Sequence, residues 1–127
     1  TCCAVALKNI EIIEEEGLIE RARVMGDHLM KGLQSLAGMA HVGDIRGVGL
    51  MAAVEVVKDP ASRKAYGASE KIGPRIVQEM HQRGVYTRCR GDSINFAPPL
   101  VVSTSQIDRM VEVARDAIQV VCEDVGL

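Results

Sequence analysis

The stretch from Gly84 to Leu100, GVYTRCRGDSINFAPPL, constrains the fold more than any other part of the chain. Two runs of strand-forming residues flank the pair Gly91-Asp92, and a two-residue turn of this type joins antiparallel strands and fixes their register. The register predicts three facing pairs on one side of a hairpin: Arg90 with Ser93, Arg88 with Asn95, and Tyr86 with Ala97.

Side chains alternate between the two faces of a strand, so this hairpin has one apolar and one polar face. The residues expected on the apolar face are Val85, Thr87, Cys89, Ile94 and Phe96. The polar face centres on Arg88 and Asn95. Because a guanidinium binds a carboxylate through two parallel hydrogen bonds, which a lysine cannot do, one interpretation is a carboxylate site. The other interpretation is that Arg88 and Arg90 are solvated charges on an edge strand.

The remaining sequence predicts an α+β fold, a small antiparallel sheet packed with helices in the order ααββαββα. Expected helices lie near Cys3 to Glu15, near Leu18 to Leu36, over a stretch that includes Ile72 and Met80 and ends before Gly84, and after Ser103. Further strands are expected near Val42 to Arg46 and Leu50 to Val57. Gly17 ends the first helix, and Ser103 stands three residues before Gln106, which is the spacing of a capping box. The strand after Leu50 is apolar on both faces except for Glu55, which predicts a central strand covered on both sides.

Length and composition are those of an ordinary soluble domain. The 127 residues are enough for one domain, residues 1–127, with a sizeable core. Hydrophobic residues make up 47%, charged residues 25%, and the formal charge is −2, which gives no reason to expect nucleic acid or an acidic membrane. No apolar run is long enough to span a membrane and no basic leader is visible, so we expect a cytoplasmic location.

Other reactive residues predict no catalytic or metal site. The four cysteines, Cys2, Cys3, Cys89 and Cys122, form no CxxC pair and join no histidine at metal-ligand spacing, so we expect reduced thiols. His28, His41 and His81 lie on separate elements, which favours packing or surface roles over catalysis. Arg46 either lines a pocket or pairs with Asp44 or Glu55, and we favour the structural role.

Three stretches resemble segments of the class III, pyridoxal-phosphate-dependent aminotransferases. The hairpin matches the family's Gly-Val-x-x-Arg run, glycine turn, apolar strand and Pro-Pro-Leu at Gly84, Val85, Arg88, Gly91, Ile94 and Pro98-Pro99-Leu100. GDIRGVGLMAAVEVV, Gly43 to Val57, resembles the family's Arg-Gly-x-Gly-Leu strand pair. CAVALKNIEIIEEEGLIERA, Cys3 to Ala22, resembles the helix pair that opens the family's C-terminal part. The three stretches stand in the family's order and span nearly the whole chain.

The resemblance implies that the chain is the C-terminal small domain of such an enzyme, without its large catalytic domain. In the family, the lysine that binds pyridoxal phosphate covalently lies in the large domain, and no lysine here has a similar context. We therefore expect no catalytic, cofactor-binding or metal-binding residue in this fragment, and no activity from it alone. The implied partners are the large domain of the same polypeptide, an amine or amino acid, and a keto acid such as pyruvate, in a homodimeric enzyme.

The resemblance also assigns substrate-binding residues. In the pyruvate-using ω-aminotransferases, an arginine at the position matching Arg88 binds the substrate carboxylate and swings out for a large amine. Members acting on ornithine, acetylornithine or 4-aminobutyrate carry the arginine where this chain has Asn95, which has no charge. The resemblance thus implies Arg88 as the carboxylate ligand with Asn95 beside it, and Arg90 and Tyr86 as secondary candidates.

Two functions of other classes stay open. A non-catalytic binding or regulatory module would bind an anion on the face formed by Tyr86, Arg88, Arg90 and Asn95. An association domain would present the apolar start from Cys2 to Leu7 to a partner.

Overall fold

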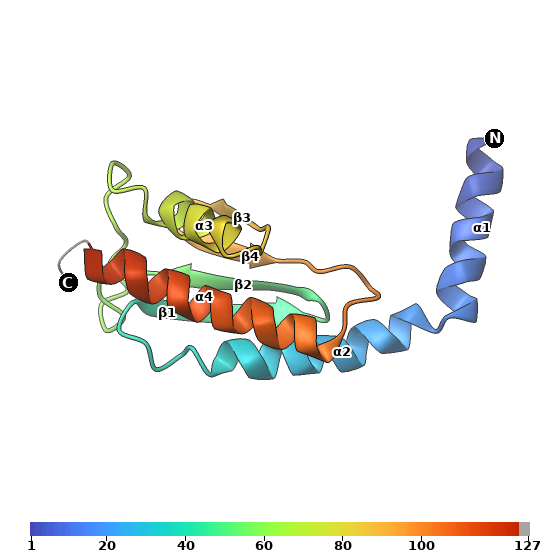
Figure 1. Cartoon of the computed structure of the whole chain (residues 1–127), viewed down its shortest axis with the longest axis horizontal. Coiled ribbons are helices and arrows are strands. Elements are labelled where there is room, and N and C mark those ends of the chain that lie inside the picture. Colours follow the sequence, from blue (N-terminus) through green and yellow to red (C-terminus); the bar gives the residue numbers. More distant parts are fainter. Residues whose placement is uncertain (125–127) are drawn as a thin grey trace.

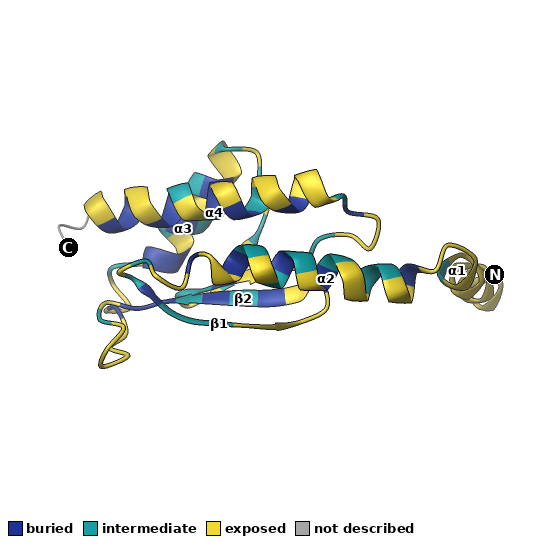
Figure 2. Cartoon of the chain, turned by 90° about the horizontal axis from the view of Figure 1, so that it is seen from below, coloured by how far each residue is buried: buried dark blue, intermediate teal, exposed yellow. Residues whose placement is uncertain are grey.

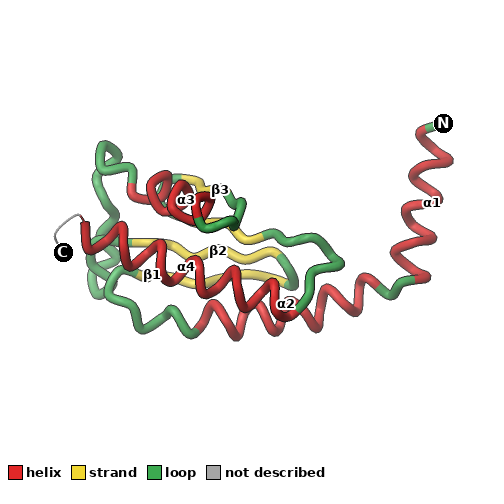
Figure 3. The backbone as a smooth tube through the Cα atoms, viewed as in Figure 1, coloured by secondary structure: helices red, strands yellow, loops and turns green. Residues whose placement is uncertain are grey.

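The computed structural model describes residues 1–124, which form four helices and four strands (Figures 1 and 3). In chain order these are α1 (Cys2–Glu15), α2 (Leu18–Gln34), β1 (Val42–Val48), β2 (Met51–Val56), α3 (Ile72–Gln82), β3 (Arg88–Arg90), β4 (Ser93–Phe96) and α4 (Thr104–Asp124). The α+β class and the order ααββαββα are confirmed.

The strands make one antiparallel sheet in the order β1-β2-β4-β3. Within the β3–β4 hairpin, Arg88 pairs with Asn95 and Arg90 with Ser93, which confirms the register predicted from the turn. Strand β2 lies between β1 and β4, so its central position is confirmed as well. The sheet therefore joins two consecutive hairpins through the β2–β4 contact.

Helices cover one face of the sheet. Helix α2 packs on β1 and β2, α3 packs on β3 and β4, and α4 packs against both α2 and α3. Figure 2 shows α2 and α4 on the same side of β1 and β2, with their buried residues turned inward. The largest fully buried side chains of this core are Leu29, Leu33, Leu36, Val54, Val56, Ile72, Ile76, Met80, Ile94, Ile107, Val113 and Ile118.

Local signals set two helix boundaries as the sequence predicts. Gly17 follows α1 in the left-handed region at φ 59°, where a residue without Cβ is favoured. Before α4, the backbone N–H of Ser103 donates to Oε1 of Gln106 over 2.9 Å, and the N–H of Gln106 donates to Oγ of Ser103 over 3.3 Å. The capping box is therefore formed in both directions.

Helix α1 stands apart from the rest of the fold (Figures 1 and 2). It contributes no buried residue as far as the structure describes the chain, and Val5 and Leu7 are each 64% exposed. An apolar helix with this much exposed surface is unusual for a chain that folds by itself. None of the helices in residues 1–124 combines the length and the apolar character needed to cross a membrane.

Candidate functional site

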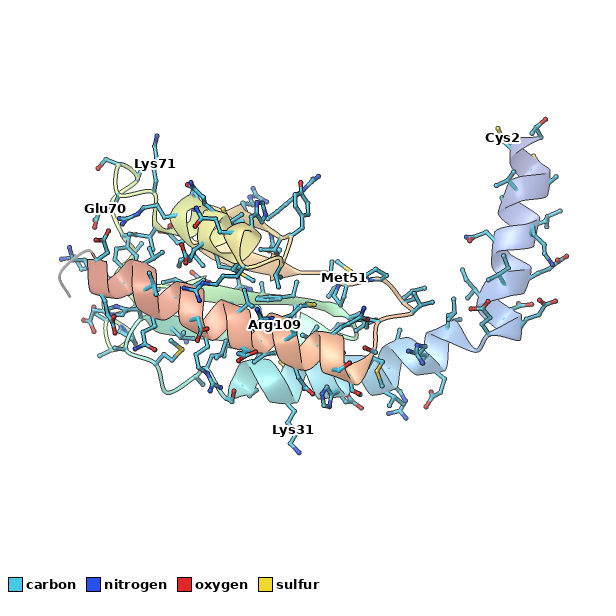
Figure 4. All side chains as sticks on the ribbon, in the orientation of Figure 1. Cys2, Lys31, Met51, Glu70, Lys71 and Arg109 are labelled. Carbon is cyan, nitrogen blue, oxygen red and sulfur yellow. The ribbon has the colours of Figure 1, made fainter. Side chains whose placement is uncertain are left out.

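The face of the sheet opposite to the helices is uncovered within residues 1–124, and we call it the open face. Register and strand alternation place ten residues on it: Asp44, Arg46, Val48, Met51, Ala53, Glu55, Arg88, Arg90, Ser93 and Asn95. Val48 is 84% exposed and Met51, labelled in Figure 4, is 73% exposed. The sequence predicts that the central strand, β2, is covered on both faces, but residues 1–124 cover only the face toward the helices.

Two rows of side chains cross the open face. One row runs Arg46, Ala53, Asn95, Arg88, and the neighbouring row runs Asp44, Glu55, Ser93, Arg90. Adjacent members of a row lie about 4.8 Å apart at the backbone, and the two rows are separated by about 7 Å along the strands. Arg88 and Asn95 are therefore immediate neighbours on one face, as the sequence predicts.

Arg46 is held by two carboxylates. Its Nη1 donates to Oδ2 of Asp44 over 2.8 Å and to Oε2 of Glu55 over 2.7 Å. These hydrogen bonds, first with Asp44 and then with Glu55, raise the pKa of the Arg46 guanidinium. The pairing favoured from the sequence is confirmed, with both carboxylates as partners, and the alternative holds as well, because Arg46 also lines the cavity described below.

Arg88 and Arg90 differ from Arg46 in having no such partner. Both are exposed, and neither makes an ion pair or side-chain hydrogen bond with any residue from 1 to 124, whereas Arg46 binds two carboxylates. The side-chain amide of Asn95 is likewise without a hydrogen bond in the described chain. An exposed guanidinium beside an amide can donate to both oxygens of a carboxylate ligand.

An open cavity of about 780 Å³ occupies part of this face. From the two rows it is lined by Arg46, Ala53, Glu55, Arg90, Ser93 and Asn95. The small side chain of Ala53 leaves a depression between larger neighbours. Asn95 and Arg90 therefore line the cavity directly, and Arg88 lies beside Asn95 but outside the lining.

The placement of Tyr86 differs from its prediction. The β3–β4 ladder begins at Arg88, so Tyr86 does not pair with Ala97 in it. Its ring instead stacks on His81 of α3, with ring centroids 4.6 Å apart and planes 10° apart. Tyr86 lines a second cavity of about 700 Å³, next to Pro98 and the start of α4. Stacking on the helix thus separates Tyr86 from the cavity that Arg90 and Asn95 line.

The side chains of His28, His41 and Cys122 make structural contacts. His28 Nε2 lies 2.7 Å from Oδ1 of Asp108, a surface contact between α2 and α4 that spacing along the chain did not indicate. The Tyr66 hydroxyl contacts His41 Nδ1 at 3.1 Å and Cys122 Sγ at 3.8 Å. Burial raises the pKa of both Tyr66 and Cys122, which keeps these groups protonated and unreactive. Residues 1–124 contain no group of three metal-ligating side chains.

Sequence reasoning missed one residue of this site, Asp92, which lines the cavity together with Arg90 and Asn95. Asp92 was considered only as part of the turn, but its Oδ1 also accepts a hydrogen bond of 2.9 Å from the backbone N–H of Gly73 in α3. A signal was available, because α3 begins after Lys71, whose side chain cannot accept a hydrogen bond from a helix N-terminus. Such a helix needs a cap from elsewhere in the fold.

Comparisons with known proteins agree on one family. The family model for class III aminotransferases matches residues 1–118. The chain is 38% identical over 116 residues to an adenosylmethionine-8-amino-7-oxononanoate aminotransferase of Anoxybacillus flavithermus, with 91% of this chain and 26% of that protein covered. It is 37% identical over 116 residues to a putrescine–pyruvate aminotransferase of Pseudomonas aeruginosa, with 91% and 25% covered.

The fold has close structural counterparts. A thermostable omega transaminase six-fold mutant from Pseudomonas jessenii superimposes with a TM-score of 0.92 at 41% identity, over 98% of this chain and 28% of that chain. The chain therefore spans about a quarter of the length of the relatives that it matches. Because the family model covers most of the sequence and the same fold recurs at this identity, the chain belongs to the class III aminotransferase family.

Proposed function

We propose that this chain is the C-terminal small domain of a pyridoxal-phosphate-dependent class III aminotransferase, and that its open face forms one wall of the substrate pocket. The full-length enzyme, a homodimer, transfers an amino group from an amine or amino acid to a keto acid such as pyruvate. Pyridoxal phosphate supplies an electron sink for that reaction when it is bound. The part of the enzyme in this chain contributes recognition of the substrate carboxylate by Arg88, with Asn95 beside it.

One observation carries this proposal, namely the contrast between the arginines of the open face. Arg46 is neutralised by Asp44 and Glu55, so it has little capacity for a further anion. Arg88 is exposed on the same face with no carboxylate partner within residues 1–124. A charge-assisted hydrogen bond to such a guanidinium contributes about 1.5–3 kcal/mol, which is enough to discriminate a carboxylate from a neutral group.

The lysines of this chain do not fit the cofactor. A lysine that binds pyridoxal phosphate must project into a cavity and lose part of its solvation. All five lysines are exposed, and Figure 4 shows Lys31 and Lys71 pointing away from the body of the fold. Neither of the two cavities described above is lined by a lysine. We therefore assign the cofactor to the remainder of the polypeptide.

The cofactor assignment is tested on the chain alone. After mixing with pyridoxal phosphate and reduction with borohydride, peptide mass mapping should find no stoichiometric adduct at a single lysine, because an exposed lysine gains no selectivity from its surroundings. A saturable adduct at one of the five lysines would contradict it and would give this chain a cofactor site of its own.

The exposed helix α1 supports the same proposal. Its apolar side chains have no cover from residues 1–124, and the superposition on the Pseudomonas jessenii enzyme includes nearly the whole chain, hence most of α1. We propose that the rest of the polypeptide covers α1 in the intact enzyme. Hydrogen exchange of the monomeric chain should show little protection from Cys3 to Leu7, whereas strong protection there would mean that the helix already has its partner.

The carboxylate role of Arg88 is tested in the full-length enzyme. Arg88→Ala should weaken the half-reactions of amino acids and keto acids by about 2–4 kcal/mol, since it removes a charged ligand with two hydrogen bonds. Simple amines lack a carboxylate, so their half-reaction should change little. Single-turnover kinetics with one amino acid and one amine measures the ratio directly. Equal losses for both substrates would show that Arg88 does not bind the carboxylate.

One observation favours the alternative, an anion-binding or regulatory module. Arg63 and Arg90 line the same cavity, and neither makes an ion pair within the described chain. Such a module should bind pyruvate or inorganic phosphate by itself. Calorimetric titration of the chain alone with pyruvate or phosphate separates the two functions. Saturable binding that is lost in Arg90→Ala supports the anion-binding module. Absence of binding supports a pocket wall that needs the rest of the enzyme.

A further inference from the structure

We propose that Asp92 and Gly73 are positioning residues for substrate recognition, because they fasten the strand that carries Arg88 to the N-terminus of α3. The inference rests on the proposed role of Arg88 and names the device that orients it. Neither residue touches substrate in this proposal. Both act through the placement of β3.

Strand β3 needs support from outside the sheet. It is an edge strand of only three residues, Arg88 to Arg90, and it pairs with β4 alone. A strand of this length has few ladder hydrogen bonds to resist tilting, and an edge position leaves its outer side without a partner strand. Helix α3 lies against β3 and β4 and is the element that can supply the support (Figure 1).

Asp92 fixes the end of the hairpin at the turn. Helix α3 begins after Lys71, which has φ 50° and gives no side-chain cap. The cap comes instead from Asp92, whose Oδ1 accepts from the backbone N–H of Gly73 over 2.9 Å. A carboxylate is favoured there because the first turn of a helix presents unsatisfied N–H groups and a partial positive charge. The backbone carbonyl of Asp92 also accepts from the N–H of Val56 at the end of β2, over 2.9 Å.

Gly73 makes this contact possible sterically. A Cβ at position 73 would overlap the carbonyl oxygen of Gly91 and would lie 2.9 Å from Cα of Asp92. The backbone of the helix therefore meets the backbone of the turn directly, with no side chain between them. A residue with any side chain at position 73 has to push the turn, and with it β3, away from the helix.

The opposite end of β3 is fastened to the other end of α3. His81 Nε2 lies 2.9 Å from the carbonyl oxygen and 3.2 Å from the backbone nitrogen of Thr87, so either ring tautomer finds a partner in the same residue. Tyr86 stacks on the His81 ring, and the Thr87 hydroxyl donates to the carbonyl oxygen of Asn95. Arg88 and Arg90 therefore lie between the two contacts of α3 with the hairpin, Gly73 with Asp92 and His81 with Thr87.

The consequence for function follows from geometry. A bidentate ion pair needs the guanidinium plane aligned with the carboxylate. A displacement of a substrate-positioning group by about 1 Å lowers the reaction rate on the order of a hundredfold. Removing the Asp92 carboxylate frees the turn from the N-terminus of α3. Strand β3 is then held by its ladder to β4, by the bond from Val56 N–H to the Asp92 carbonyl and by the contact at Thr87, and it can tilt away from the helix at the turn. Arg88 keeps its charge in that case but loses its alignment.

The experiment measures selectivity in the full-length enzyme, as the ratio of single-turnover rate constants for an amino acid and for a simple amine. Both substrates report on the same folded population, so the ratio is insensitive to loss of folded enzyme. Asp92→Ala should lower the ratio by about ten- to a hundredfold. Asp92→Asn should lower it by no more than about threefold, because the amide oxygen still accepts from Gly73.

Two controls separate positioning from general damage. Glu70→Ala removes a carboxylate that accepts from the backbone N–H of Gly67 over 2.8 Å just before α3, without touching the hairpin, and it should leave the ratio unchanged. Gly73→Ala should lower the ratio like Asp92→Ala, although alanine has the higher helix propensity. An unchanged ratio in Gly73→Ala, or equal losses in Asp92→Ala and Glu70→Ala, would overturn the inference.

A double mutant distinguishes failure of this inference from failure of the proposed function. If Asp92 acts through Arg88, Arg88→Ala with Asp92→Ala should have the ratio of Arg88→Ala alone within about twofold. Multiplying losses would show that Asp92 acts independently and would overturn the positioning role. If Arg88→Ala leaves the ratio unchanged, the proposed role of Arg88 fails, and the positioning role of Asp92 fails with it. If Arg88→Ala lowers the ratio but Asp92→Ala does not, the proposed role of Arg88 stands and only the positioning role of Asp92 fails.

Discussion

The two hairpins of the sheet are supported in the same way. The β1–β2 turn contains Gly49 at φ 53° and packs on Gly26 of α2, and the β3–β4 turn contains Gly91 at φ 58° and packs on Gly73 of α3. In both cases a Cβ on the helix glycine would collide with the backbone of the turn. Each hairpin is thus seated on a helix by glycine-to-glycine contact.

The hairpins differ in how their charges are satisfied. On β1 and β2, the guanidinium of Arg46 is shared by Asp44 and Glu55. On β3 and β4, Arg88 and Arg90 have no carboxylate partner within residues 1–124, although they project from the same face. The backbone support is common to both hairpins, so the pairing of charge is what separates a structural arginine from a candidate ligand-binding one.

The largest effect on this comparison is expected from Gly26→Ala. The added Cβ would lie 2.5 Å from the carbonyl oxygen of Gly49, so the turn has to move, and overpacking of this kind costs about 1–3 kcal/mol. Urea unfolding of the chain measures the loss. Gly32→Ala is the matched control in the same helix, where the nearest atom is a methyl group of Val111 that can adjust. Stabilisation by Gly26→Ala would mean that helix propensity outweighs the contact.

Arg88→Lys tests what the unpaired charge of the second hairpin requires. Lysine keeps the charge but lacks the planar fork, so one of two hydrogen bonds to a carboxylate is lost. In the full-length enzyme, selectivity for an amino acid over an amine should fall by about 1–1.5 kcal/mol, less than in Arg88→Ala. Single-turnover kinetics on the two substrates measures it. A lysine variant equal to the native enzyme would show that charge alone is recognised.

Arg46→Ala tests the paired charge of the first hairpin. Because the arginine and both carboxylates are about half exposed, the loss of stability should be less than about 1 kcal/mol. The effect should also shrink as salt is added, since exposed ion pairs are screened. Urea unfolding at low and high ionic strength measures both. A loss that is large and independent of salt would assign Arg46 a packing role beyond its ion pairs.

Arg90→Ala should have the smallest effect. Arg90 lies next to the turn and is exposed, where a single charge contributes about 1 kcal/mol or less to binding. The amino acid to amine ratio in the full-length enzyme should change by less than it does in Arg88→Ala. A larger change in Arg90→Ala would transfer the role of carboxylate ligand from Arg88 to Arg90.

Much of the fold was predictable because its signals are local. The turn at Gly91-Asp92 set the β3–β4 register, and the Ser103 to Gln106 spacing predicted the cap that α4 has. The apolar character of β2 predicted its central place in the sheet. Each of these depends on residues within a few positions of one another, so the sequence contains the whole signal.

The candidate site was predictable only in part. The facing of Arg88 and Asn95 follows from hairpin register, and the structure agrees. The same alternation predicts Tyr86 on this face, but Tyr86 lies outside β3, stacks on His81 and lines a different cavity. That contact depends on how α3 lies against the hairpin, which no period in the sequence specifies.

The sequence by itself determined the element order, the register of the second hairpin and the residues that face one another across it, because backbone sterics and side-chain alternation act over short distances. The sequence indicated Asp44 or Glu55 as a partner for Arg46, but only the tertiary structure decided that Arg88 and Arg90 have no carboxylate partner within residues 1–124. Arg46 lies on β1, and Arg88 and Arg90 lie on β3 at the opposite edge of the same sheet. The antiparallel pairing of β1 with β2 brings Asp44 and Glu55 to Arg46 alone. Tertiary packing also supplied the cap of α3 from Asp92, nineteen residues beyond Gly73, because the free N–H groups of a helix N-terminus donate to any carboxylate that the fold brings within hydrogen-bond distance.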